Sequence, residues 1–156
     1  MTTTFPLSRV AFFGRSFFEY RKMFDLDINS LSHTQVLDCP SGPSSFAAEA
    51  SEYDIEVTAI DPLFNHTYTA LSTIAVTSFH NMFSTIREHT GMVTTEKTFP
   101  SIDQAEEDRR KALNLFLEDY YTGLANRRYI CASLPTLPFP DKSFDLVLNG
   151  HLLFIY

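Results

Sequence analysis

Two short apolar segments, each ending in an aspartate, constrain the fold of this chain most strongly. Thr34–Asp38 and Ile55–Asp61 are brief and rich in aliphatic and β-branched residues, which is typical of buried strands. The Ser- and Ala-rich segment Ser44–Glu52 between them has the length of one crossover helix. Strand, helix and strand in this order predict a parallel pair with a right-handed connection. The sequence therefore predicts an α/β fold.

Two further strands and three longer helices are predicted along the chain. Arg128–Ala132 and Phe144–Asn149 are short apolar segments of the same kind as the first two strands. Apolar residues spaced by three and four positions are typical of one face of a helix. This spacing predicts helices over Ser8–Phe24, from about Thr67 to His89, and from Ser101 to Gly123.

The length of 156 residues suits one domain, 1–156. We expect residues 1–32 to form an N-terminal helical segment, and residues 33–63 and 128–156 to form the α/β core. Residues 64–127 between them are expected to form a helical insertion. Insertions above strand ends commonly build a lid or a substrate wall. The alternative is that the aromatic residues of this insertion only pack its helices against each other.

Composition and charge exclude several classes of protein. The net charge of −7 disfavours binding of nucleic acid through the bulk surface, because phosphate contacts need clustered Lys and Arg. No apolar run reaches the roughly 18 to 20 residues that span a bilayer. The first residues resemble no secretory signal, which favours the reducing cytoplasm, with Cys39 and Cys131 as free thiols. The histidines show no metal-ligand spacing, and no metal site is predicted.

Polar residues follow the first two predicted strands, where ligands bind in open parallel sheets. Asp38 is followed by a polar turn in which Gly42 allows a ligand to approach the backbone. Ser44 or Ser45 can cap the helix that follows. Asp61 ends the second strand, and a carboxylate at that place can accept two hydrogen bonds from the cis-diol of a ribose. These residues predict a nucleotide-type site.

Three separated segments resemble the class I S-adenosylmethionine-dependent methyltransferases. They are Val36–Gly42, Val57–Asp61 and Leu137–Leu148, of which the last, with its LPFPD-x-SFD run leading into the fourth strand, is the most specific. The resemblance implies a Rossmann-like, mostly parallel sheet of the methyltransferase type, truncated after its fourth strand. It also implies S-adenosylmethionine as the cofactor.

The resemblance further assigns roles to individual residues. It places Asp38, Cys39, Pro40 and Gly42 beside the methionine portion and ribose of the cofactor, Asp61 on the ribose hydroxyls, Ser133 and Leu134 beside the adenine, and Asn149 towards the methionine moiety or the methyl group. The loop departs from the family pattern because Gly42 is its only glycine, and Ser133 replaces the usual acid. We interpret this as a variant of the loop.

Residues outside the loop are candidates for further roles. His151 follows the fourth strand closely and is the best candidate for a catalytic proton acceptor, the alternative being a structural or solvent-facing histidine. Arg15, Glu19 and Tyr20 on the first helix are candidates to close over the cofactor, although periodicity alone places Tyr20 in the core.

The predicted function is transfer of a methyl group to a small molecule, with no nucleic acid and no membrane as partner. The alternative is a non-catalytic or truncated S-adenosylmethionine-binding remnant that acts as an interaction module. A nicotinamide-binding Rossmann protein is a third, weaker interpretation. The free edge of the fourth strand predicts a homodimer or another partner that covers it.

Overall fold

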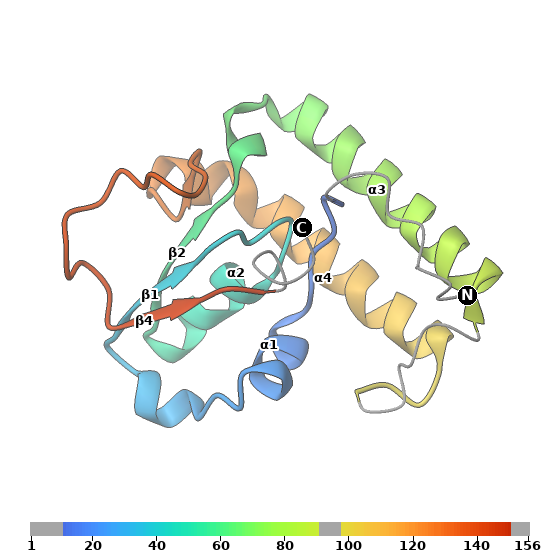
Figure 1. Cartoon of the computed structure of the whole chain (residues 1–156), viewed down its shortest axis with the longest axis horizontal. Helices are drawn as coiled ribbons and strands as arrows, with labels where there is room; N and C mark the ends of the chain where they lie inside the picture. The colour runs from blue at the N-terminus through green and yellow to red at the C-terminus, as the bar shows by residue number, and fades with distance from the viewer. Residues whose placement is uncertain (1–10, 91–97, 151–156) are drawn as a thin grey trace.

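The strands form one parallel sheet (Figure 1). The structure is a computed structural model that describes residues 11–90 and 98–150. The strands of this sheet lie in the order β3-β2-β1-β4, and every neighbouring pair is parallel. This confirms the predicted α/β, Rossmann-like arrangement. The strands are β1 (Gln35–Asp38), β2 (Glu56–Ile60), β3 (Tyr129–Ile130) and β4 (Leu146–Leu148).

The register aligns the carboxyl ends of β1, β2 and β4. Asp38, the last residue of β1, lies opposite Ala59 of β2 on one side and Leu148 of β4 on the other. The residues that follow these strands therefore meet at the carboxyl end of the sheet. This end holds Asp61 and Asn149 beside the turn after Asp38.

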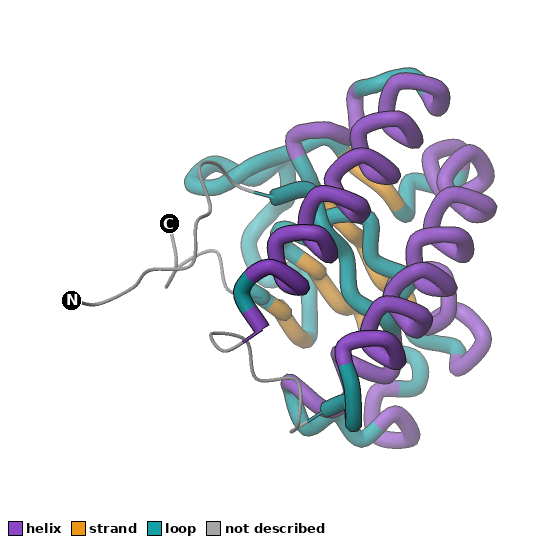
Figure 2. Tube along the Cα trace, turned by 90° about the vertical axis from the view of Figure 1, so that its right-hand side faces the viewer, coloured by secondary structure: helices purple, strands orange, loops and turns teal. Residues whose placement is uncertain are grey.

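Four α-helices accompany the sheet in the described part of the chain, and the two longest lie between β2 and β3, within the predicted insertion. Figure 2 shows these two helices in front of the sheet. Thr67 and Ser101 cap their first turns by accepting hydrogen bonds from the backbone N–H groups of Ala70 and Gln104. The helices are α1 (Phe17–Met23), α2 (Phe46–Ala50), α3 (Tyr68–Glu88) and α4 (Ile102–Ala125), with short 3₁₀ turns at Ile28–Leu31, Ser51–Tyr53 and Pro62–Asn65.

The first helix is shorter than the apolar spacing predicts, because it begins only at Phe17. Ser16 and Glu19 form a capping box, in which each side chain accepts a hydrogen bond from the other residue's backbone N–H. Residues 11–15 are not helical. Gly14 lies so close to the loop after β1 that a Cβ atom added to it would stand 2.1 Å from the carbonyl oxygen of Pro43. Tertiary contact therefore overrides the helical pattern there.

The two faces of the sheet are covered differently. One face packs against all four helices, and Phe46, Phe116 and Tyr120 are fully buried in that core. The other face is covered by the segment between β3 and β4, where Phe139 and Phe144 pack edge to face over Leu37 and Ile60. The LPFPD-x-SFD run thus forms the apolar cover of one face of the sheet.

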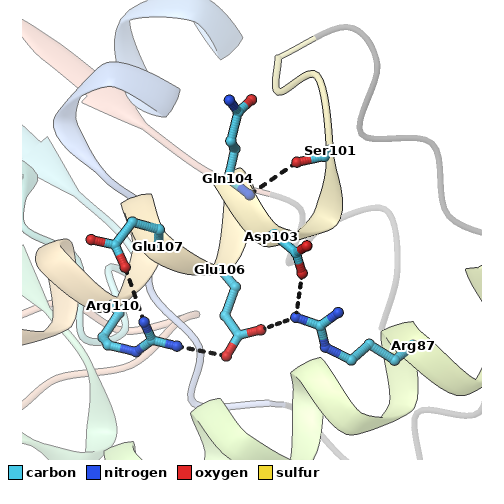
Figure 3. A network of polar contacts seen from close by, with 7 residues as sticks. All are labelled: Arg87, Ser101, Asp103, Gln104, Glu106, Glu107 and Arg110. Carbon is cyan, nitrogen blue, oxygen red and sulfur yellow. Dashed lines mark hydrogen bonds and ion pairs between the residues drawn. The ribbon is translucent and has the colours of Figure 1, made fainter.

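Ion pairs join the end of α3 to the start of α4 (Figure 3). Arg87 on α3 pairs with Asp103, at 2.7 Å, and with Glu106 on α4. Arg110 pairs with Glu106 and Glu107 on its own helix. The Arg87 and Arg110 side chains are exposed, so these pairs contribute little to the free energy of folding. The apolar contacts of the two helices contribute more.

The sheet has a free edge along β4. Within the part of the chain that the structure describes, β4 pairs only with β1, and the Val147 side chain is 57% exposed. Both cysteines are free thiols, as expected, with Cys39 buried and Cys131 exposed. Among the described helices, none combines the length and the apolar character that a bilayer crossing requires.

Replacing Phe116 with alanine tests the core between the helices and the sheet. The Phe116 ring is fully buried and lies within 6 Å of Phe64, Tyr120 and Tyr129, so its loss leaves a cavity and should lower the free energy of unfolding by about 3–5 kcal/mol. Leu115→Ala, the neighbouring position at 40% exposure, should change it by less than about 1 kcal/mol. Urea unfolding measures both, and equal effects of the two variants would contradict this core.

Candidate functional site

The turn after β1 is bonded to the ends of both neighbouring strands. The backbone N–H of Gly42 donates to Oδ2 of Asp61, after β2, at 3.2 Å. The amide nitrogen of Asn149, after β4, donates to the carbonyl oxygen of Cys39 at 2.7 Å. Asp38, Cys39, Gly42, Asp61 and Asn149 therefore form one cluster at the carboxyl end of the sheet.

Local geometry explains the residue types in this turn. Gly42 has φ = +56°, in the left-handed region where a side chain is strained. The Cys39–Pro40 peptide bond is cis. Ser45 is the N-cap residue of α2, but its side chain accepts a hydrogen bond from the backbone N–H of Phe17 instead of capping the helix. The Ser44 side chain, one residue earlier, accepts the backbone N–H of Phe46 at 3.0 Å. A single glycine is therefore enough for this turn.

Asp38 is the most deeply buried polar residue of the cluster, with no exposed surface. The Tyr20 hydroxyl donates to its carboxylate and lies 2.8 and 3.0 Å from the two oxygens. Burial raises the pKa of Asp38 to about 7, although the Tyr20 hydrogen bond opposes this shift. Burial and the nearby Asp38 carboxylate also raise the pKa of Tyr20, so Tyr20 acts as the proton donor of the pair.

Asp61 is held by the backbone on both sides. Its Oδ1 accepts the N–H of Leu63 at 2.9 Å, and its Oδ2 accepts the N–H of Gly42. Burial raises the pKa of Asp61 to about 6, while these two backbone hydrogen bonds work in the opposite direction. Each carboxylate oxygen keeps a second lone pair for another donor.

Asn149 carries an unpaired polar atom. Its amide nitrogen faces the Cys39 carbonyl, which fixes the other amide atom as oxygen. That oxygen, Oδ1, is buried and accepts no hydrogen bond from any residue that the structure describes. Because an unsatisfied buried acceptor is costly, a donor that reached this atom would remove that cost.

The remaining predicted residues lie further from this cluster or outside it. Ser133 and Leu134 follow β3 and are exposed, in a tight turn closed by a bridge between Ser133 and Thr136. The Cys131 thiol donates to the carbonyl oxygen of Pro62, which places the start of this turn beside Asp61. Burial raises the pKa of the Cys39 thiol to about 11, so this cysteine stays protonated. His151 lies outside the described residues.

Two cavities lie at opposite ends of the sheet. The cavity beside Gly14 and Pro43, next to the turn after β1, has a volume of about 10 Å³. A larger one of about 410 Å³ lies where the strands begin, lined by residues such as Gln35, Glu56 and Arg128. The space beside the turn after β1 on the side of Gly14 is therefore small, and the larger cavity is at the amino ends of the strands, where no ligand site is predicted from the sequence.

Sequence reasoning left the place of Tyr20 unresolved and missed Arg109. Tyr20 reaches Asp38 from 18 positions earlier in the chain, and periodicity described it only as a core residue. Arg109 binds Glu19 across 90 positions. In the sequence, Arg109 belongs to a short basic run that is typical of an exposed helix face. Neither contact could be predicted from the sequence, because the two partners of each lie far apart in the chain and no nearby residue pattern indicates them.

The comparisons with known proteins identify one uncharacterised relative. The chain is 32% identical over 146 residues to an uncharacterised protein of Methanocaldococcus jannaschii. The aligned region covers 92% of this chain and 63% of that protein, so the chain spans less than two thirds of the length of its relative. No family model matches the chain, and no solved structure matches it significantly.

The stability of the protein should depend on pH through Asp38. Its pKa is about 7 in the folded state and 3.8 as the ordinary value, so between these values the folded state binds more protons than the unfolded state. The free energy of unfolding therefore falls as the pH rises through this range. In Asp38→Asn, the free energy of unfolding should decrease less steeply with pH, because the titrating carboxyl group is removed.

Urea unfolding over a pH series measures the slope for the wild type and the variant. Asp141→Asn, at an exposed position in the segment between β3 and β4, should leave the wild-type slope unchanged. An Asp38→Asn protein with the full wild-type slope would contradict the assignment to Asp38. Asp61, with a pKa of about 6, should account for part of the slope that remains.

Proposed function

We propose that this chain binds S-adenosylmethionine at the carboxyl end of its sheet and belongs to a methyltransferase of the class I type that acts on a small molecule. The observation that carries the proposal is the buried Oδ1 of Asn149, directly after β4, which has no hydrogen-bond partner among the described residues while the amide nitrogen of the same side chain donates to the carbonyl oxygen of Cys39. The parallel β3-β2-β1-β4 order supports it, since ligands of such sheets bind at this end.

The residues present fit the methionine portion of this cofactor. Its ammonium group carries only hydrogen-bond donors. The Asn149 oxygen is an acceptor that lacks a donor among the described residues. The nearby carboxylate of Asp61 gives the cluster a negative charge that suits a ligand carrying an ammonium and a sulfonium, and Asp38, with a pKa of about 7, adds to this charge where it is ionised. Asp38 is already bonded to Tyr20, so its contribution is charge rather than a direct hydrogen bond.

Asp61 fits the ribose. Both of its oxygens are fixed by backbone N–H groups, so the carboxylate cannot rotate away from the site. With a pKa of about 6 it is mostly ionised at neutral pH. Two free lone pairs on a fixed carboxylate match the two hydroxyls of a cis-diol. The Ser133 turn beside Pro62 supplies the neighbouring surface for the adenine.

The chain's own residues mainly position the reactants. When bound, S-adenosylmethionine supplies an electrophilic methyl group, and its transfer requires alignment with an unprotonated nucleophile. The turn at Gly42 lets a ligand lie directly on the backbone, and the buried surroundings of Asp38 exclude water. His151 is proposed as the group that accepts the proton of the methyl acceptor. We place this reaction in the reducing cytoplasm, where thiols stay reduced; the two free cysteines of the chain agree with this location.

A second candidate is a domain that binds S-adenosylmethionine, or another partner, without catalysis. The burial of the turn after β1 favours this non-catalytic candidate, because Asp38, Cys39 and Ser41 are each less than 10% exposed. We also propose that β4 pairs with a second copy of the chain, which is supported by its free edge and the exposed Val147 side chain.

Calorimetric titration of two variants with two ligands tests the cofactor site. Asn149→Ala should raise the Kd for S-adenosylmethionine about tenfold and leave that for adenosine unchanged, because adenosine lacks the ammonium group; one hydrogen bond to a charged group is worth about 1.5–3 kcal/mol. Asp61→Asn should weaken the binding of both ligands. The Asp141→Asn protein serves as the control.

Each alternative has its own outcome in these titrations. Absence of heat and of a thermal shift with S-adenosylmethionine and S-adenosylhomocysteine at millimolar concentration would refute the cofactor. Binding of NAD instead would favour the nicotinamide-type Rossmann protein. Tight cofactor binding without methyl transfer to any acceptor would favour the non-catalytic module.

Sedimentation of the wild type and of Val147→Lys tests the proposed dimer. The wild type should sediment as a dimer at tens of micromolar, and the variant as a monomer, because a lysine on an edge strand opposes strand addition. Tyr121→Lys, at a 78% exposed position on α4, should leave the dimer intact. A wild-type monomer at this concentration would count against pairing through β4.

A further inference from the structure

We propose that residues 11–15, here called the strap, form a gate over the cofactor turn, and that the Glu19–Arg109 ion pair is its latch. The inference rests on the cofactor site proposed above and concerns how that site is opened. In the structure the strap crosses the turn directly. A Cβ atom added to Gly14 would lie 2.1 Å from Pro43 O and 2.6 Å from Ser44 N. Backbone therefore touches backbone at this crossing.

The strap occupies the side from which a ligand would approach Gly42. A Cβ atom added to Gly42 would face backbone atoms of Phe13 at 3.6 to 3.8 Å. The space left beside this crossing, between Gly14, Pro43 and the helices α3 and α4, is about 10 Å³. That volume holds about one water molecule, whereas pockets for ligands of drug or cofactor size measure about 300–1,000 Å³. A nucleoside ligand reaches Gly42 on this side only after the strap moves.

Two hydrogen bonds hold the end of the strap and the start of α1 to Ser45, at the end of the turn. The backbone N–H of Ser45 donates to the carbonyl oxygen of Arg15 at 3.3 Å. The backbone N–H of Phe17, at the start of α1, donates to Oγ of Ser45 at 3.2 Å. Opening the strap breaks both bonds, so these two amide protons report on the gate.

The latch lies on the other side of the strap. The Arg109 guanidinium on α4 donates from Nε and Nη2 to both carboxylate oxygens of Glu19, at 2.5 to 3.0 Å. Both side chains are largely buried, at 17% and 6% exposure. The same guanidinium lies over the Phe13 ring of the strap, 4.9 Å from its centroid. Arg109 thus fastens α1 and the strap to the inserted helical pair.

Further charges surround the latch without replacing it. Arg15 lies 3.9 Å from Glu19, a longer contact than that of Arg109. Burial and the nearby Arg109 lower the pKa of Arg15. Asp108, next to Arg109 in the chain, has a buried Oδ2 without a partner among the described residues. The close, multiply bonded contact in this cluster is therefore the one between Glu19 and Arg109.

A gate of this kind makes the latch a control on affinity. If the ligand binds only the open state, the apparent Kd equals the intrinsic Kd divided by the open fraction. Weakening the latch then raises the open fraction and tightens apparent binding. A strap that forms part of the binding surface predicts the opposite, since loosening it removes ligand contacts. The sign of the change separates the two roles.

The first measurement needs no ligand. In Arg109→Gln, amide hydrogen exchange of Phe17 and Ser45 should accelerate at least tenfold, while exchange of the Phe116 amide, within α4, stays as in the wild type. Glu19→Gln/Arg109→Gln removes both charges together and should show the same pattern without leaving a buried charge unpaired. Arg110→Gln removes the neighbouring guanidinium, which is exposed and pairs within its own helix, and should change none of these rates.

The second measurement uses S-adenosylmethionine. In Arg109→Gln and in the double variant, its association rate constant should rise about tenfold and its Kd should fall by a similar factor; Arg110→Gln should match the wild type. Slower association or a higher Kd in these variants would overturn the gate, as would unchanged exchange at Phe17 and Ser45. Faster exchange without any ligand binding would support the latch and refute the proposed cofactor.

Discussion

The carboxylate of Asp38 at the end of the central strand is the constraint on which the arrangement of this chain depends. A carboxylate without exposed surface needs a donor, and β2 and β4 occupy both sides of β1. The donor therefore comes from outside the sheet, from Tyr20 of α1. This fixes α1 over the end of β1, and the residues before α1 then have to cross the turn that begins at Cys39.

The helix α1 carries two consecutive residues with different partners. Tyr20 fastens it to the sheet through Asp38, and Glu19 fastens it to the long helix α4 through Arg109. Glu19 also closes the capping box that starts the helix at Phe17. A helix of seven residues thereby connects the turn after β1 with the inserted helical pair. If the helices α3 and α4 moved relative to the sheet, these contacts would transmit the movement to the turn after β1.

Local signals explain what could be predicted from the sequence. The four strands and α3 and α4 follow from apolar spacing and caps such as Thr67 and Ser101, and the cluster of Asp38, Gly42, Asp61 and Asn149 follows from the order of parallel strands. The start of α1 could not be predicted, because the contact of Gly14 with Pro43 joins distant parts of the chain. The partners of Asp38 and Glu19 are also distant, and the covered state of the turn results from them.

The bonding of the cluster determines where a ligand gains most. The oxygens of Asp38 and Asp61 already accept hydrogen bonds within the protein, so a ligand donor there only adds a bond to a group that is already satisfied, or replaces a bond that is lost. An added bond is worth about 0.5–1.5 kcal/mol and a replaced one yields little net gain. The Asn149 oxygen has no partner to replace among the described residues, so a donor that reaches it also removes the cost of an unsatisfied buried acceptor. Recognition should therefore be weighted towards the group that meets Asn149, and this is the reason for proposing that the site distinguishes an ammonium-bearing ligand from a bare nucleoside.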